Sequence, residues 1–143
     1  MGHAHDVIDE LRGPTRSLRQ AAPAAWGGFT KLHGAAVADG VLPGRVKELM
    51  ALAIAVVKAC DGCIAYHAQA AVRKGATPEE VAEALSVDPL MDGGTATVYG
   101  PRAWAAFEEF AAPWHLPHSD RELIPRPDRQ LGGLRRSRQL FSF

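Results

Sequence analysis

Residues 48–67 read ELMALAIAVVKACDGCIAYH, an apolar run followed directly by a Cys-x-x-Cys motif and a histidine. The apolar side chains of residues 49–57 cover nearly the whole circumference of a helix, so we expect this helix to be buried on all sides. The short connection around Lys58–Cys60 predicts that a second helix packs antiparallel against it. On this second helix, positions 60, 63 and 67 share one face, because an α-helix turns about 100° per residue.

On either side of this stretch, helix signals dominate, and no segment shows the two-residue alternation of a half-buried strand. Pro43 and Gly75 mark the outer ends of the two helices, which we place at residues 43–57 and 61–74. A capping box at Thr77 and Glu80 opens the next helix, which Asp88-Pro89 interrupts. Further helices are expected over residues 4–12, ending before Gly13-Pro14, over residues 24–38, and over residues 95–110, with a break at Gly100-Pro101 left open.

The length of 143 residues suits one domain with a single core. We assign residues 1–112 to an all-α, single-domain helical bundle. Residues 113–143 hold four of the ten prolines and a basic cluster at residues 135–138. This segment is predicted to be an extended or mobile tail. A helix that is apolar on every side is difficult to bury in so small a domain, so we expect self-association.

Charge and hydropathy exclude several classes of protein. Lys plus Arg and Asp plus Glu both total 16, so no bulk charge points to nucleic acid. Residues 1–112 carry 10 basic and 13 acidic side chains, and residues 113–143 carry 6 and 3. The N-terminal sequence MGHAHD lacks the features of a signal peptide, and the run 49–57 is far shorter than the roughly 20 residues that span a bilayer. We expect a cytoplasmic protein without membrane contact.

The two cysteines of the chain are Cys60 and Cys63. A bridge between them closes almost no loop and would add little stability, and in the cytoplasm a close dithiol is more often catalytic or metal-binding than structural. A thiol reacts as its thiolate, which a helix N-terminus or a positive partner favours. His67 lies one turn beyond Cys63 and can exchange a proton with it, and Glu48 can polarise His67. This pattern predicts attack of a thiolate on a peroxide, giving a sulfenic acid that condenses with the second thiol.

Each of these residues has a simpler interpretation. The cysteines could bind zinc, with His67 and Glu48 completing four ligands. Glu48 alone is typical of a solvated helix-start carboxylate, and His67 alone of a histidine in an ordinary hydrogen bond. His33 is interpreted as structural, although it could face the site. No glycine-rich phosphate loop and no Ser/His/Asp arrangement is recognisable, and we expect no bound cofactor or metal.

The spacing Glu48-x11-Cys60-x2-Cys63-x3-His67 resembles the signature of the AhpD-like branch of the carboxymuconolactone decarboxylase family. The resemblance covers roughly residues 25–111 and includes the segments 63–67, 71–80, 98–101 and 106–110. It implies an AhpD-like helical bundle that assembles into a homo-oligomer, a trimer or a hexamer. Asp61-Gly62 fills the cysteine motif, where the best-known peroxidases of this branch carry a histidine next to the attacking cysteine.

The resemblance also implies an activity, that of a peroxiredoxin-type oxidoreductase reducing small hydroperoxides. In that reaction Cys63 attacks the hydroperoxide, Cys60 is the resolving partner, and His67 and Glu48 form the proton relay. The electron donor it implies is a protein or small thiol, such as a lipoyl-bearing protein. Two alternatives stay open: a carboxymuconolactone decarboxylase-like enzyme of aromatic degradation, which needs no dithiol, and a non-catalytic redox-sensing oligomer.

Overall fold

The structure is a computed structural model that describes residues 2–112. Within these residues the chain is all-α and forms a single helical domain without strands, as predicted. The helices are α1 (His3–Ala21), α2 (Pro23–Ala36), α3 (Gly44–Val57), α4 (Asp61–Arg73), α5 (Pro78–Ser86), α6 (Asp88–Asp92) and α7 (Gly94–Ala111). The tail predicted over residues 113–143 lies outside the described residues.

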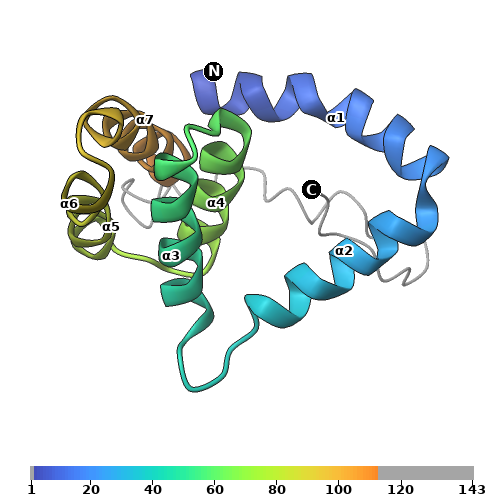
Figure 1. Cartoon of the computed structure of the whole chain (residues 1–143), viewed down its shortest axis with the longest axis horizontal. Coiled ribbons are helices and arrows are strands. Elements are labelled where there is room, and N and C mark those ends of the chain that lie inside the picture. The colour runs from blue at the N-terminus through green and yellow to red at the C-terminus, as the bar shows by residue number, and fades with distance from the viewer. Residues whose placement is uncertain (1, 113–143) are drawn as a thin grey trace, which may run out of the picture.

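α3 and α4 are the central pair of the bundle and lie side by side and antiparallel (Figure 1). α7 packs against both, and α5 and α6 lie beside α3 and α7 (Figure 1). The core is rich in alanine, which lets the helix backbones approach closely, and larger side chains fill the spaces between layers. Its members include Leu52, Ala55, Val56, Ala65, Ala68, Ala71, Val81, Ala103, Ala106 and Phe107.

The turn between α3 and α4 fixes the position of the first cysteine. Ala59 adopts the left-handed conformation with φ of 50°. Its N–H donates to Val56 O at 2.9 Å, and the N–H of Cys60 donates to Ala55 O at 3.1 Å. This pair of hydrogen bonds is a Schellman motif, which ends a helix and reverses the chain. Cys60 is therefore the last residue of the motif that ends α3, and it is also the N-cap of α4.

α4 ends in the same way at the glycine that the sequence suggested. Gly75 has φ of 77°, and Gly75 N–H and Ala76 N–H donate to Val72 O and Ala71 O, each at 3.0 Å. The capping box that opens α5 is also confirmed, with Thr77 and Glu80 hydrogen-bonded to each other's backbone. Asp88-Pro89 does interrupt the next helix, since α5 stops at Ser86 and α6 is a separate turn.

Two Gly-Pro pairs do not end or break their helices. The helix expected over residues 4–12 continues through Gly13-Pro14 to Ala21. Proline removes one backbone hydrogen bond, but both residues are exposed, so water can satisfy the carbonyl that loses its partner. α7 likewise passes Gly100-Pro101 without a break.

Within residues 2–112, the expectation that residues 49–57 are buried on all sides is wrong. Leu49, Leu52 and Val56 are buried, but Met50 is 52 % exposed and Ile54 is 59 % exposed. α4, α5, α6 and α7 cover the other faces of α3, and the described residues supply no further element for this one. An apolar stripe of Met50, Ile54 and Val57 thus remains on the surface of α3.

α1 and α2 form an arm that leaves the bundle and returns to it (Figure 1). Ala4 and Ile8 bury the first half of α1 against the core, and Glu109 of α7 accepts hydrogen bonds from the backbone N–H groups of Ala4 and His5. None of the residues of α2 is buried. Trp26 is thus only partly covered by the described residues.

Candidate active site

Cys60 and Cys63 are joined by a disulfide at the start of α4, with their Cα atoms 5.2 Å apart. The Sγ atom of Cys60 accepts a hydrogen bond from the N–H of Cys63 at 3.3 Å, so the sulfur caps the helix. Both residues are partly buried. Since a helix N-terminus favours negative charge, this position suits a sulfur that alternates between thiolate and disulfide.

Glu48 and His67 meet between α3 and α4. Oε2 of Glu48 lies 2.8 Å from Nδ1 of His67, and Glu48 is 1 % exposed. An ionised carboxylate only accepts hydrogen bonds, so Nδ1 of His67 carries the proton and Nε2 of the neutral ring is left as the basic atom. His67 also lies one helical turn beyond Cys63, on the same face of α4. The structure thus joins Glu48 to His67 and Cys60 to Cys63, as the sequence pattern suggested.

Lys74 is a member of this site that the sequence reasoning missed. Its Nζ lies 3.1 Å from Oε1 of Glu48 and donates to the carbonyl of Val37, the C-cap of α2, at 2.7 Å. Burial alone would raise the pKa of Glu48, but hydrogen bonds from His67 and Lys74 and the charge of Lys74 outweigh it and hold the pKa below its ordinary value. The buried carboxylate is therefore ionised. The available signal was the spacing, since Lys74 follows His67 by seven residues, two turns along one face.

His33 faces the site rather than serving only as a packing residue of α2. Its ring centroid lies 6.2 Å from that of His67. Burial lowers the pKa of His33 below its ordinary value, and the positive charges of His67 and Lys74 add to this, while Glu48 opposes it. The cluster therefore contains Glu48, His67, Lys74 and His33, contributed by three helices.

The two residues inside the cysteine motif have separate contacts. Nη1 of Arg102 on α7 lies 3.2 Å from each carboxylate oxygen of Asp61 and so offsets a negative charge next to Cys60. A Cβ atom on Gly62 would lie 3.0 Å from Cδ1 of Leu11 on α1. The glycine thus lets α1 approach the cysteine turn.

The other histidines belong elsewhere. His5 pairs with Glu109 at the start of α1, and His3 is exposed there. His115 and His118 lie outside the described residues. Over residues 2–112, no group of three or more His, Cys, Asp or Glu side chains is arranged to hold a metal ion. No helix in this part of the chain is long and apolar enough to cross a membrane.

Comparison with known proteins agrees with this geometry. A model described as the carboxymuconolactone decarboxylase family matches residues 23–112. The chain belongs to this family. The family assignment spans α2 to α7 and contains Glu48, Cys60, Cys63 and His67, and it confirms the resemblance drawn from the sequence.

Similar proteins are known from several bacteria. An uncharacterized protein of Cupriavidus necator is 41 % identical over 105 residues, 73 % of this chain and 93 % of the relative. A protein of Paracoccus denitrificans, described as uncharacterized protein 4 in the cox locus, is 40 % identical over 81 residues, 57 % of this chain and 73 % of the relative. The crystal structure of an apo carboxymuconolactone decarboxylase family protein from Legionella pneumophila matches with a TM-score of 0.73 and 38 % identity, over 76 % of this chain and 96 % of that protein.

Proposed function

We propose that this protein is a thiol-dependent peroxidase of the AhpD-like branch, which reduces small hydroperoxides through Cys63 and Cys60. The observation that supports it best is the buried carboxylate–imidazole pair, Glu48 and His67, one helical turn from a cysteine that forms a disulfide with its neighbour in the motif. A base oriented in this way raises the thiolate fraction of an adjacent cysteine. Family membership agrees with the proposal without specifying the activity.

The proposed reaction starts from the reduced dithiol. His67 takes the thiol proton of Cys63 at Nε2, and the thiolate attacks the outer oxygen of the hydroperoxide. The O–O bond breaks, the alkoxide leaves with the proton held by His67, and Cys63 is a sulfenic acid. The Cys60 sulfur then attacks that of Cys63. The S–S bond forms, and the hydroxide takes the Cys60 proton and leaves as water, so one hydroperoxide and two thiols become one alcohol, one water and one disulfide.

Glu48 and Lys74 support this chemistry indirectly. The ionised Glu48 holds His67 in one tautomer and stabilises the imidazolium that forms when it takes a proton. Lys74 keeps Glu48 ionised despite its burial. Re-reduction of the disulfide needs a thiol donor, and we propose a small thiol or a lipoyl-bearing protein in the cytoplasm. Neither the donor nor the substrate requires nucleic acid or a membrane.

Peroxide consumption by the reduced protein, with dihydrolipoamide, glutathione and dithiothreitol as donors, tests the proposal. We expect multiple turnovers in the wild type and none in Cys63→Ser. Cys60→Ser should react once and leave a sulfenic acid on Cys63 that dimedone traps. A Cys63→Ser variant that consumes peroxide at the wild-type rate would refute the assignment. Reversible oxidation without turnover would favour the redox-sensing alternative, and release of carbon dioxide from a carboxymuconolactone by the Cys63→Ser variant would favour the decarboxylase.

We also propose that the protein works as a homo-oligomer, a trimer or a hexamer. The apolar stripe of Met50, Ile54 and Val57 on α3 supports this, because within residues 2–112 a central helix of the bundle leaves these large side chains uncovered. Light scattering at micromolar protomer concentration should give a multiple of the monomer mass. Ile54→Lys should shift that mass toward the monomer, whereas a monomeric wild type would refute the proposal.

A further inference from the structure

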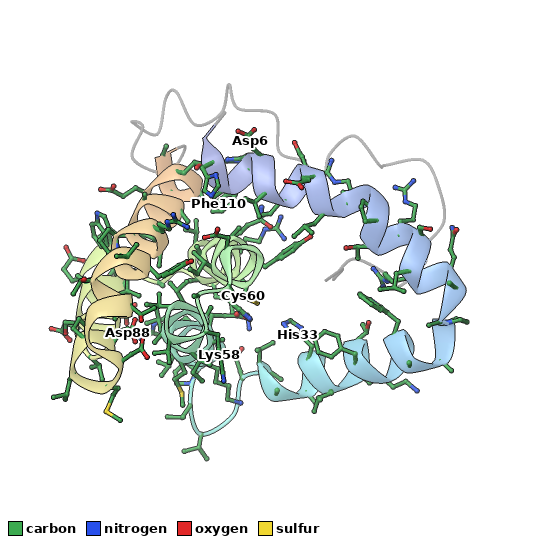
Figure 2. All side chains as sticks on the ribbon, turned by 45° about the horizontal axis from the view of Figure 1, so that its top comes forward. Asp6, His33, Lys58, Cys60, Asp88 and Phe110 are labelled. Carbon is green, nitrogen blue, oxygen red and sulfur yellow. A yellow bond between two sulfur atoms is a disulfide. The ribbon has the colours of Figure 1, made fainter. Side chains whose placement is uncertain are left out.

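Arg102 of α7 reaches across to the residue that follows Cys60. Its Nη1 atom lies 3.2 Å from each carboxylate oxygen of Asp61, the first residue of α4. Its Cζ atom lies 4.8 Å from the centre of the Tyr99 ring, one turn earlier on α7, so an aromatic face supports the guanidinium. Two contacts of different kinds therefore hold a cation at the N-terminus of α4, the end of the helix that Cys60 marks in Figure 2.

The stability of the fold gives little reason for this ion pair. The side chains of Asp61 and Arg102 are 39 % and 47 % exposed, and ion pairs this exposed add little to the free energy of unfolding. Ala103, the residue after Arg102, is fully buried in the core that α7 shares with α4, so the two helices pack together without the arginine. The effect of the pair on the charge beside the cysteines is therefore the larger one.

Asp61 acts on α4 and on Cys60 in opposite directions. A carboxylate in the first turn stabilises a helix, because it complements the helix dipole. The same negative charge lies one residue from the N-cap sulfur and disfavours its thiolate, because like charges repel. Arg102 offsets that charge at the carboxylate itself. α4 thus keeps an acidic first turn without suppressing the thiolate of Cys60.

Other charged and titratable groups surround the same turn. The helices that pack against α4 are α1, α3 and α7. Together with the turn and α4 itself they contribute Lys58, His67, Glu48, Tyr99 and the ion-paired Asp9 and Arg12. None of these is altered in the comparisons below, so their effect on Cys60 cancels.

We propose that Arg102 is a positioning residue for Cys60: it neutralises Asp61, so that the sulfur of Cys60 can become a thiolate. The inference rests on the proposed role of Cys60 as the resolving thiol. In that step the Cys60 thiolate attacks the sulfenic acid of Cys63, and the S–S bond forms as the S–O bond breaks. The hydroxide that leaves takes up the proton that Cys60 released and becomes water. Arg102 thus acts on the resolving step, whereas Glu48 and His67 act on the attack.

The test measures the thiol of Cys60 in a Cys63→Ser background, where it is the sole thiol. Its rate of alkylation by iodoacetamide, an uncharged probe, is followed from pH 6 to pH 10. The parent is compared with Arg102→Gln, Arg102→Lys, Asp61→Asn and the double variant Asp61→Asn/Arg102→Gln. Lysine keeps the positive charge of the arginine, and the double variant removes both charges at once.

The two single neutralising changes should have opposite effects. At pH 7, Arg102→Gln should react about two- to fivefold more slowly than the parent and Asp61→Asn faster by a similar factor, the range that exposed charge pairs give. The double variant and Arg102→Lys should react close to the parent rate. All rates should converge at pH 10, where the thiol is largely ionised. Loss of a merely structural ion pair would instead move both single variants in the same direction.

Arg45→Gln is the matched control. It breaks another arginine–carboxylate pair of similar exposure, with Glu80, at the opposite end of α3, and should follow the parent at every pH. Single variants that change in the same direction would overturn the inference, as would an Arg102→Gln profile identical to that of the parent.

A second measurement addresses resolution in the chain with both cysteines. Arg102→Gln should lengthen the lifetime of a dimedone-reactive sulfenic acid on Cys63 at pH 7 by the same factor as in alkylation. An unchanged lifetime would overturn the role of Arg102 in this step. If the alkylation rates behave as expected but peroxide forms no sulfenic acid, the effect of Arg102 on the Cys60 thiolate holds and the proposed function fails.

Discussion

Replacing Asp88 by asparagine should stabilise the fold at neutral and alkaline pH. Asp88 opens α6 and is 3 % exposed, and in Figure 2 it lies on the opposite side of α3 from His33. Among the described residues, the Oδ2 atoms of Asp88 and Asp92 have no hydrogen-bond partner. Burial, with repulsion from Asp92, raises the pKa of Asp88 from 3.8 to about 6.

The magnitude follows from proton linkage. Between pH 3.8 and about 6 the folded protein holds a proton on Asp88 that the unfolded chain has released, so stability falls as the pH rises through this range. Each pH unit of difference in pKa corresponds to 1.36 kcal/mol, so the ionised carboxylate costs the fold about 3 kcal/mol above pH 7. Asparagine removes the charge but brings an amide N–H₂ that needs a partner. We therefore expect a gain of about 2 kcal/mol at pH 8.

Urea unfolding of wild type and Asp88→Asn at pH 5 and pH 8, at equal protomer concentration, measures this gain. Comparing the two proteins at each pH cancels contributions from Glu48, His33 and the other titrating groups. The variant should be about 2 kcal/mol more stable than the wild type at pH 8 and lose most of this advantage by pH 5. Glu83→Gln, at an exposed position on α5, should show no such dependence. If Asp88→Asn were equally destabilised at both pH values, the ionised carboxylate would have a stabilising partner and the reasoning would be refuted.

Three further substitutions test the contacts that hold the helices around the site, each through its effect on the free energy of unfolding. Ala59→Gly should raise the free energy of unfolding by about 0.5–1 kcal/mol in urea titrations, because glycine adopts the left-handed conformation without steric cost. Lys74→Met should lower it by about 2 kcal/mol at pH 7, since the buried Glu48 loses its cation, and the loss should shrink as acid protonates Glu48. Glu109→Gln should cost about 1 kcal/mol and speed hydrogen exchange in the first turn of α1. Hydrogen bonds from His5 and the α1 backbone hold the pKa of Glu109 low despite burial, so the stability it adds is present above pH 4.5 and should disappear as the pH falls.

Local signals predicted most of the helical frame. The capping box at Thr77, the glycine after Lys74 and the proline after Asp88 each act through the backbone of the residues beside them, and each lies where the sequence placed it. The same reasoning failed at Pro14, because the cost of a proline inside a helix depends on whether the lost hydrogen bond is buried. It failed at Met50 and Ile54 because periodicity states which side chains are apolar and not which of them the chain can cover.

In the candidate site too, the residues related by local spacing could be predicted, and those brought together by tertiary packing could not. Cys60, Cys63 and His67 were recognisable together because they share one face of one helix, and Glu48 followed from the antiparallel packing expected of the helix before it. Lys74 is the C-cap of that helix, but a lysine after an alanine-rich run gives no sequence signal for a functional role. Only its distance to the buried carboxylate of Glu48 identifies it as part of the site. His33 lies 34 residues before His67 and reaches it only through the return of the α1–α2 arm.

The α1–α2 arm is the part of the site that apolar packing holds least firmly. α1 is held at its first turn by Glu109 and buried alanine and isoleucine side chains, while α2, without a buried residue, is tied at its last turn by Lys74. A lysine that serves both the buried carboxylate and the end of α2 couples the two, so a change in the charge of Glu48 is felt by the helix that carries His33. Packing alone would give α2 little reason to keep this place, since few apolar contacts hold it. The electrostatics of the relay therefore help to position the arm, and the arm in turn contributes to the electrostatics of the relay.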